Sequence, residues 1–306
     1  MMKYFIQVSV QCHTIFGQLQ STQFGNVSKT YLIASISSDI GFELAKTWIA
    51  EGHKVIGTYR NWNKSLEYFQ HSKNVELFHM DFNNLDEFPV TTQKIIDSMS
   101  YWDNLIIASG SQEPIGLFSE IEFSDWKLGF EMNFISQLEF LHKMLPYRKI
   151  RKKTEDNIPS VLFFAGGGTN NSVNYYSAYT VAKIALIKMC EILDSEIPDT
   201  KFCILGPGWV NTKIHNPTLF DQGKNSRENY RKTIEMLRTA EESCTPMEKI
   251  VSACNWLLDV NSKLISGRNF SVVNDLLGEN ELLEVLAKDI NMYKLRRSGN
   301  DWKGNL

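Results

Sequence analysis

Residues 29–59 read KTYLIASISSDIGFELAKTWIAEGHKVIGTY, and this stretch decides the fold of the chain. Its first part, Tyr31–Ser35, is apolar and predicts a buried strand. A helical pattern follows over about Asp39–Gly52, where the glycine is typical of the residue just beyond a helix C-terminus. Lys54–Tyr59 then predicts a second strand. Because a strand, a helix and a strand follow one another here, we expect a parallel crossover unit.

The alternation of short β-rich runs and longer helical runs continues to about residue 275. It predicts one α/β domain of the Rossmann type, doubly wound around a seven-stranded, mainly parallel sheet. Residues 1–28 read as an N-terminal extension, residues 29–275 as the Rossmann domain, and residues 276–306 as a C-terminal helix and tail. The further strands are expected at Val75–His79, Asn104–Ser109, Ser160–Ala165, Lys201–Leu205 and Arg268–Val273.

Long helices are predicted over about Phe123–Leu145 and Tyr176–Leu193. Between the last two strands, about Thr212–Pro246 is polar and irregular, with a helix expected at Arg227–Thr239. We expect this segment to close over a substrate, because binding residues concentrate on loops of this kind. It carries no motif that names the substrate.

The composition indicates a soluble globular protein, since 43% of the residues are hydrophobic and 22% are charged. The formal net charge of −3 gives no reason to expect a nucleic acid or an anionic membrane as partner. No apolar run approaches the roughly 20 residues that cross a bilayer. The five cysteines are scattered without CxxC or metal-ligand spacing, which predicts no metal site and a reducing, cytoplasmic location.

The turn between the first strand and its helix is where a dinucleotide's pyrophosphate binds in this architecture. A glycine-rich turn carries three glycines, and this one retains only Gly41, the position for close packing of helix on strand. Ser35 stands where the tight turn needs glycine, and Asp39 where the backbone approaches phosphate. We expect Asp39 to turn away from the phosphate and cap helix amides. Three further residues of this turn would contact phosphate or cap the helix, namely Ser37, Ser38 and Ile40.

The end of the second strand distinguishes between cofactors. A protein that binds NAD usually places an acid about 20 positions past the glycine turn, where it holds the ribose hydroxyls. Here the segment reads Thr58-Tyr59-Arg60-Asn61 and has no acid. The Arg60 guanidinium would hold a 2′-phosphate by charge-assisted hydrogen bonds. We therefore predict NADP as the cofactor, with NAD as the alternative if Arg60 is only a solvated side chain.

Tyr179 and Lys183 stand at positions i and i+4 of the second long helix, so they share one face. A free phenol has a pKa of about 10, and a neighbouring ammonium stabilises its phenolate. Such a tyrosine exchanges a proton with a carbonyl or an alcohol while hydride moves to or from nicotinamide. The pair is common in sequences, and it gains meaning here from its place after the fifth strand.

With these residues in place, the chain resembles the short-chain dehydrogenase/reductase family across nearly all of residues 29–275. The family's glycine turn is matched, in a variant sequence, by Ser37-Ser38-Asp39-Ile40-Gly41. Asn133, in the first long helix, matches the family's catalytic asparagine. The matches to the adenine contact, to the usual Asn-Asn-Ala-Gly stretch and to the nicotinamide-lining segment are Asp81, Ala108-Ser109-Gly110 and Pro207-Gly208-Trp209-Val210-Asn211-Thr212.

The resemblance implies a role for each matched residue. Tyr179 would be the acid/base, and Lys183 would lower its pKa and hold the nicotinamide ribose. Asn133 would position a water that links Lys183 to solvent. Thr212 and the Val210 backbone would meet the carboxamide. The family also implies a homodimer or homotetramer.

One feature of the family is missing, namely the serine that hydrogen-bonds the reacting oxygen. The two positions where it is expected hold Ala165 and Gly166, which have no side-chain donor. Loss of one such donor can lower the rate by about 10²–10³. The substitutes available in the same loop are Thr169, Asn170 and Ser172.

A narrower similarity is to a bacterial subgroup associated with surface-polysaccharide and nucleotide-sugar metabolism. It suggests a sugar-like substrate. The segments that carry it are Phe164-Ala165-Gly166-Gly167-Gly168, Ile265-Ser266-Gly267-Arg268 and Tyr293-Lys294-Leu295-Arg296-Arg297.

Two functions from different classes fit this sequence. The first is an NADP-dependent oxidoreductase that acts on a small-molecule carbonyl or alcohol, which the retained Tyr179, Lys183 and Asn133 favour. The second is a catalytically silent nucleotide-binding protein for sensing or assembly, which the lost serine and the single turn glycine favour. An epimerase or dehydratase of the extended relatives uses the same Tyr–Lys pair, but the first turn here follows the shorter family's spelling.

Overall fold

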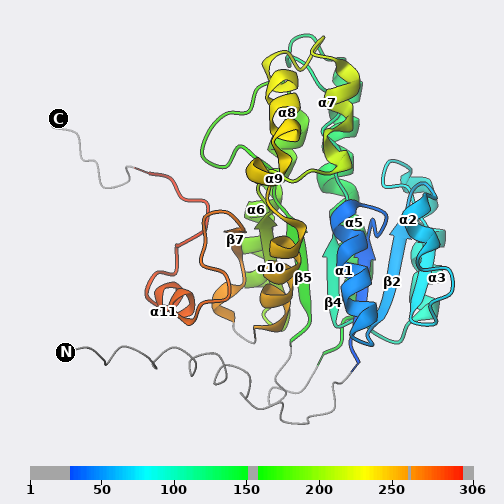
Figure 1. Ribbon diagram of the computed structural model, residues 1–306. Coiled ribbons are helices and arrows are strands. Elements are labelled where there is room, and N and C mark those ends of the chain that lie inside the picture. The colour runs from blue at the N-terminus through cyan, green and yellow to red at the C-terminus, as the bar shows by residue number, and fades with distance from the viewer. Residues whose placement is uncertain (1–27, 151–157, 261–262, 299–306) are drawn as a thin grey trace, which may run out of the picture.

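The computed structural model describes residues 28–150, 158–260 and 263–298. Most of the predicted N-terminal extension, residues 1–27, therefore lies outside the described residues. Strands and helices alternate along the chain as the sequence predicts (Figure 1). The strands are β1 (Thr30–Ala34), β2 (Lys54–Tyr59), β3 (Val75–His79), β4 (Asn104–Ile107), β5 (Ser160–Phe164), β6 (Lys201–Gly206) and β7 (Arg268–Ser271).

Helices cover both faces of the sheet and extend above its carboxyl edge. Those packed on the sheet are α1 (Asp39–Ala50), α3 (Phe88–Ser98), α5 (Ser136–Met144), α6 (Ser177–Glu196) and α10 (Met247–Asp259). Helix α4 (Phe123–Phe130) packs against α6. The remaining α-helices of the described chain are α2 (Lys64–Glu67), α7 (Asn216–Asp221), α8 (Glu228–Arg238), α9 (Ala240–Ser243) and α11 (Asn280–Lys288). Within the described residues, no helix is both long and apolar enough to cross a membrane.

The seven strands form one sheet in the order β3-β2-β1-β4-β5-β6-β7. Every neighbouring pair is parallel, so the predicted mainly parallel Rossmann-type sheet is confirmed and is parallel throughout. The strand order reverses between β1 and β4, because β1 pairs with β2 on one side and with β4 on the other. In such sheets ligands bind outside the carboxyl ends of the strands at this reversal.

Strand β1 is buried over residues 31–34 because both faces of the sheet are covered. The core on one face includes Tyr31 of β1 and Trp48 of α1, whose rings stack at 3.9 Å, together with the buried side of α10. Figure 1 shows α1 and α10 on the same face of the sheet. The core on the other face is built from α3, α5 and α6.

The predicted long helix over Phe123–Leu145 is interrupted by a π-helical turn at Glu131–Ile135, between α4 and α5. Asn133 lies in this turn and is fully buried. π-helical turns are rare in proteins, and those that occur often lie at functional sites. The periodicity of the sequence does not reveal this turn. A π-helical turn adds one residue to the helix, and the apolar positions before and after it still fall on nearly the same face.

The C-terminal segment is held to the sheet by Arg268 of β7, which is 4% exposed. Its guanidinium donates hydrogen bonds to the carbonyl oxygens of Leu264, Leu286, Asp289 and Met292. These carbonyls include the C-terminal end of α11, where a cation is electrostatically favoured. Arg268 therefore has a role in the fold.

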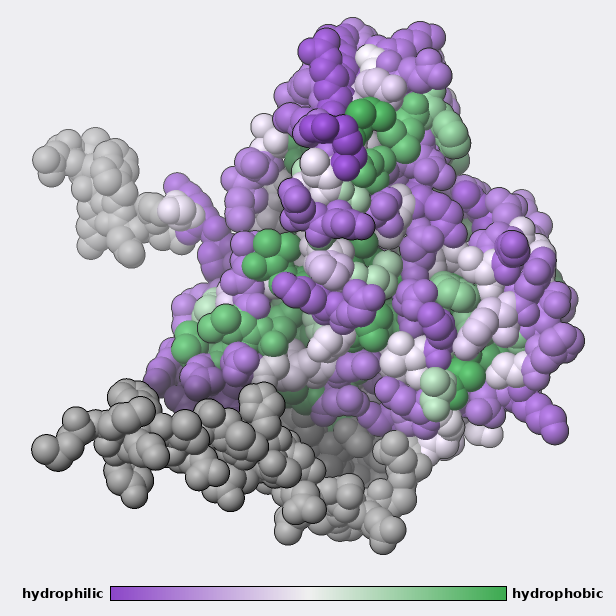
Figure 2. Space-filling view, viewed as in Figure 1, coloured by the Kyte–Doolittle hydropathy of each residue, from purple (hydrophilic) through white to green (hydrophobic). Residues whose placement is uncertain are grey.

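The segment α7–α9 rises above the carboxyl edge of the sheet (Figure 1). Its visible surface is mostly hydrophilic, with hydrophobic side chains gathered over α7 (Figure 2). Phe220 of α7 is 79% exposed, and it also lines the large cleft described below. The part of the chain that the sequence analysis expected to close over a substrate thus presents apolar surface there.

Candidate active site

A cleft of about 2130 Å³ opens at the carboxyl ends of the strands, across the reversal between β1 and β4. Its walls come from the segments that follow each of β1 to β6. Gly41 and Asn133 are buried and do not line it. The other predicted site residues all line it, and these are Ser35, Ser37, Ser38, Ile40, Arg60, Asp81, Ala108, Gly110, Tyr179, Lys183, Pro207, Val210 and Thr212.

The first turn keeps the backbone path of a glycine turn. Ser35 has a φ of 66°, the left-handed conformation for which glycine is the usual residue. Gly41 must lack a side chain, because a Cβ there would lie 2.5 Å from the Ser35 carbonyl oxygen. The backbone amides of Asp39 and Ile40 have no acceptor among the described residues. These two donors at the N-terminus of α1 suit a phosphate group.

The expectation that Asp39 caps α1 was wrong. The cap is Ser38, whose Oγ accepts a hydrogen bond of 3.1 Å from the Gly41 amide. Asp39 instead contacts Lys213, in the segment after β6. Asp39 Oδ2 accepts a 2.7 Å bond from the Lys213 amide, and Asp39 Oδ1 lies 3.2 Å from Lys213 Nζ. Lys213 is 174 positions from Asp39 in the sequence. The two residues meet because the segments after β1 and β6 both lie at the carboxyl edge of the sheet.

The ends of β2 and β3 supply the next part of the cleft. Arg60 is exposed there and has no ion-pair partner in the described part of the chain. Asp81 Oδ1 accepts a 3.0 Å hydrogen bond from the Asn83 amide, which forms a tight turn after β3. A free guanidinium and a fixed carboxylate therefore lie on neighbouring strands at the outer end of the cleft.

At the inner end of the cleft, Gly110, Asn133 and Lys183 converge. A Cβ at Gly110 would lie 3.6 Å from Asn133 Oδ1 and 3.7 Å from Lys183 Nζ. The Asn133 amide is fully engaged: Nδ2 donates to the carbonyls of Ser111 and Gly129, and Oδ1 accepts from the Ser111 amide. Asn133 thus fixes the segment after β4 to the π-helical turn.

Lys183 is 2% exposed, and its ammonium has no hydrogen-bond or ion-pair partner among the described residues. Its Nζ lies 5.8 Å from the centre of the Tyr179 ring. Burial lowers the pKa of Lys183 to about 8 and raises the pKa of Tyr179 to about 12. Sequence reasoning expected Lys183 to lower the pKa of Tyr179. In the structure, burial of the phenol determines the direction of the shift instead.

Position 166, one of the two where the missing serine is expected, is directly beside Tyr179. A Cβ at Gly166 would lie 2.9 Å from Tyr179 Oη and 2.7 Å from Cε1. The phenol therefore occupies space that a serine side chain at position 166 would need. Among the substitutes considered from the sequence, Thr169 and Asn170 line the cleft and Ser172 does not.

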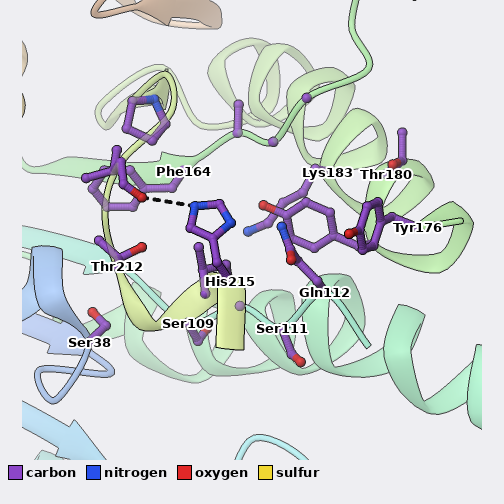
Figure 3. Close-up of a pocket in the computed structure, with 18 of the residues that line it drawn as sticks. Ser38, Ser109, Ser111, Gln112, Phe164, Tyr176, Thr180, Lys183, Thr212 and His215 are labelled. Carbon is purple, nitrogen blue, oxygen red and sulfur yellow. Dashed lines mark hydrogen bonds between the residues drawn. The ribbon is translucent and has the colours of Figure 1, made fainter. Parts of the chain in front are cut away.

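Sequence reasoning missed Gln112, which lines the cleft after β4. Its Oε1 accepts a 3.0 Å hydrogen bond from Thr218 Oγ1, and Thr218 Oγ1 lies 2.7 Å from Tyr176 Oη. Because Thr218 has a single hydroxyl proton, Tyr176 must donate to Thr218. This chain orients the amide and leaves Gln112 Nε2 as a donor without an acceptor in the described residues. Figure 3 shows Gln112 and Lys183 pointing into the same part of the cleft.

The segment after β6 provides the remaining wall, and Pro207, Val210 and Thr212 all line the cleft. His215 stacks on Trp209 at 3.8 Å, and its Nε2 lies 3.0 Å from the Val210 carbonyl oxygen. Burial lowers the pKa of His215, so the neutral ring donates to this carbonyl (Figure 3). Sequence patterns carried no signal for His215, because its partner is the carbonyl oxygen of Val210 and a backbone group has no residue type to recognise.

A nicotinamide dinucleotide fits this donor set. The unpartnered ammonium of Lys183 can meet ribose hydroxyls, and the free amides of Asp39 and Ile40 can meet a pyrophosphate. The unpaired guanidinium of Arg60 can meet a further phosphate. In the described segments, no three His, Cys, Asp or Glu side chains come close enough together to hold a metal ion.

Comparison with known proteins finds a family model, related sequences and similar structures. A short chain dehydrogenase family model matches residues 29–222. An uncharacterized oxidoreductase of Schizosaccharomyces pombe is 22% identical over 241 residues, which cover 78% of this chain and 94% of the relative. A Saccharomyces cerevisiae benzil reductase, which forms (S)-benzoin, is 26% identical over 212 residues, covering 64% and 78% of the two chains. A solved short chain dehydrogenase/reductase from the same yeast superposes with a TM-score of 0.70 at 19% identity, covering 85% of this chain and 99% of that one.

Replacement of Ser35 by glycine should stabilise the protein. The left-handed conformation at this position costs a non-glycine residue about 1 kcal/mol. Glycine removes this cost, but its greater freedom in the unfolded chain cancels part of the gain. We expect Ser35→Gly to raise the free energy of unfolding by roughly 0.5 kcal/mol in urea titrations. Ser37→Gly is the matched control and should not stabilise, since Ser37 has no positive φ. A lower stability of Ser35→Gly would contradict the strain at this turn.

Proposed function

This chain belongs to the short chain dehydrogenase family, and on that premise we propose that it is an NADP-dependent carbonyl reductase. The observation that carries the proposal is the buried, unpartnered ammonium of Lys183 beside Tyr179, at the inner end of a cleft that fits a dinucleotide. The alternative of a catalytically silent nucleotide-binding protein is not favoured, because the similar proteins with a stated activity are named as oxidoreductases or reductases.

The cofactor, when bound, supplies hydride to the carbonyl carbon of the substrate. Tyr179 Oη donates a proton to the carbonyl oxygen as negative charge develops there. The Lys183 ammonium stabilises the phenolate that remains, and it holds a ribose hydroxyl. Asn133 keeps the segment after β4 and the π-helical turn in place beside Lys183. The residues that would hold the cofactor are Ser35, Ser37, Ser38, Ile40, Gly41, Arg60, Asp81, Ala108, Gly110, Pro207, Val210 and Thr212.

Gln112 replaces the missing serine as the second donor to the reacting oxygen. Its Nε2 is the amide end that Thr218 leaves free, and it belongs to the same cleft as Tyr179. A donor aimed at the developing oxyanion contributes a large part of the rate in reactions of this type. This assignment explains how the reaction proceeds with Gly166 at the serine position.

The proposed substrate is a ketone with apolar or aromatic groups. Trp209, Phe220 and Ile115 line the cleft, and an apolar lining favours such groups over a sugar. A yeast relative named for benzil reduction supports the same class. The bacterial polysaccharide likeness carries less weight, because two of its residues serve the fold: Arg268 binds carbonyls and Arg296 pairs with Glu191 at 2.6 Å.

Tyr179→Phe should lower the rate of NADPH-dependent benzil reduction by about 10²-fold or more, since the proton donor is lost. The dissociation constant for NADPH, measured by fluorescence titration, should change little because the phenyl ring remains. Gln112→Leu, measured in parallel, should lower kcat by about 10²-fold while NADPH affinity stays unchanged. Thr169→Val is the control for Gln112, and equal losses in the two variants would remove the special role of Gln112. Undiminished reduction by Tyr179→Phe would exclude the tyrosine from the chemistry.

Arg60→Ala should weaken NADPH binding by roughly 10–100-fold, which is the value of charge-assisted hydrogen bonds to one phosphate. NADH, which has no 2′-phosphate, should bind Arg60→Ala and the unchanged protein about equally. Calorimetric titration with both nucleotides measures the difference. Arg238→Ala, an exposed arginine outside the cleft, is the control. A similar loss for both nucleotides would refute selection of NADP by Arg60.

The proposal includes a cytoplasmic homodimer or homotetramer. The cytoplasm suits the free thiols of Cys190, Cys203, Cys244 and Cys254. Assembly is supported by the neighbouring helices α4 and α6, which expose large apolar side chains. On these two helices the exposed apolar residues are Phe123, Leu128, Val181 and Ile192.

Light scattering during gel filtration should give two or four times the chain mass of 35.2 kDa. Ile192→Asp should lower this mass, because it places a charge on the exposed face of α6. Ile290→Asp, at an exposed residue beyond α11, is the matched control and should leave the mass unchanged. A monomer at micromolar concentration would contradict the assembly.

A further inference from the structure

Asp39 creates an electrostatic problem for dinucleotide binding. It stands where a glycine turn brings the backbone up to the pyrophosphate, and its own amide is one of the two free donors there. A carboxylate at this position would repel a ligand that carries two negative charges. Unless the carboxylate is neutralised, the two amides at the N-terminus of α1 cannot be used to full effect.

Lys213 lies where it neutralises this carboxylate. Its amide and its ammonium both contact Asp39, at 2.7 Å and 3.2 Å. The ammonium also donates a 3.1 Å hydrogen bond to the Ser37 carbonyl oxygen, so it is fixed to the first turn at two points. An ammonium has three N–H bonds, and these contacts leave the third without an acceptor in the described residues. Ser37, Asp39 and Lys213 all line the cleft.

A role in stability does not account for this arrangement. The side chains of Asp39 and Lys213 are 31% and 50% exposed, and ion pairs with such exposure contribute little to stability. The pair joins the turn after β1 to the segment after β6. Its charge therefore acts on a ligand that binds between these two segments.

We propose that Lys213 is a diphosphate-binding residue of this cleft. Its ammonium neutralises Asp39 and donates its remaining N–H to a pyrophosphate oxygen of the dinucleotide. In a glycine turn only backbone amides bind the pyrophosphate, whereas here a side-chain cation binds it as well. The inference rests on the proposed binding of a nicotinamide dinucleotide, and it extends to any ligand with an adenosine diphosphate group.

The test is a double-mutant cycle on ligand binding. Dissociation constants of NADPH, NADH and ADP-ribose are measured by calorimetry for the unchanged protein, Lys213→Met, Asp39→Asn and the double variant. Lys213→Met should weaken all three ligands by about tenfold or more, since it leaves an unpaired carboxylate beside the diphosphate. Asp39→Asn should bind equally well or more tightly. The double variant should recover only part of the loss, because it lacks the repelling carboxylate but also lacks the N–H that Lys213 donates.

Two controls separate binding from folding. Lys224→Met removes an exposed lysine outside the cleft and should leave all three constants unchanged. Melting temperatures of the ligand-free variants should stay close to that of the unchanged protein, because the pair is exposed. Added salt should weaken NADPH binding to the unchanged protein more than to Lys213→Met, since the cation is the source of the attraction.

The outcomes distinguish this inference from the proposed function. Unchanged or tighter binding by Lys213→Met overturns the inference, because the ion pair would then be irrelevant or a barrier that the ligand must break. Binding of all three ligands with the expected cycle, but no carbonyl reduction, supports the inference and refutes the reductase. If the unchanged protein binds none of the three ligands, both are refuted.

Discussion

The candidate site depends on the burial of one ammonium group without a partner, that of Lys183. Helix α6 carries it into the junction of the two halves of the sheet, and the missing side chain of Gly110 leaves space beside it. Burial lowers its pKa to about 8, so the folded chain binds this proton less tightly than the unfolded chain does. Between this pKa and the unfolded value of about 10.5, stability therefore rises with pH, and below pH 8 the full cost of burying the charge is present.

The departures from a glycine-rich phosphate turn and from the catalytic serine are not independent losses. Ser35 keeps the left-handed backbone at the expense of strain, so the path of the turn is preserved. Asp39 is held by Lys213, which places a cation beside the carboxylate. At the position of the serine, Gly166 lets the Tyr179 ring approach the backbone. At Asp39 and Gly166 a neighbour in space, rather than in sequence, determines the consequence.

The same principle applies to the parts that position the chemistry. Asn133 is a positioning residue in this structure, since all its side-chain hydrogen bonds go to backbone groups of the segment after β4 and of α4. The amide of Gln112 is oriented by Thr218 of α7, so the segment above the sheet helps to set a donor in the cleft. The position of that segment and the orientation of the donor are thus physically linked.

The sequence by itself determined the fold and the order of its elements, because parallel strands buried on both faces read as apolar runs between amphipathic helices. It also determined that Tyr179 and Lys183 share a face, since this follows from the helical repeat, and that Gly41 packs helix on strand. Only the tertiary structure decided that Asp39 pairs with Lys213, that a π-helical turn holds Asn133, and that burial raises the pKa of Tyr179. These features arise where segments distant in sequence meet at the carboxyl edge of the sheet. Contacts of that kind leave no periodic pattern in the chain.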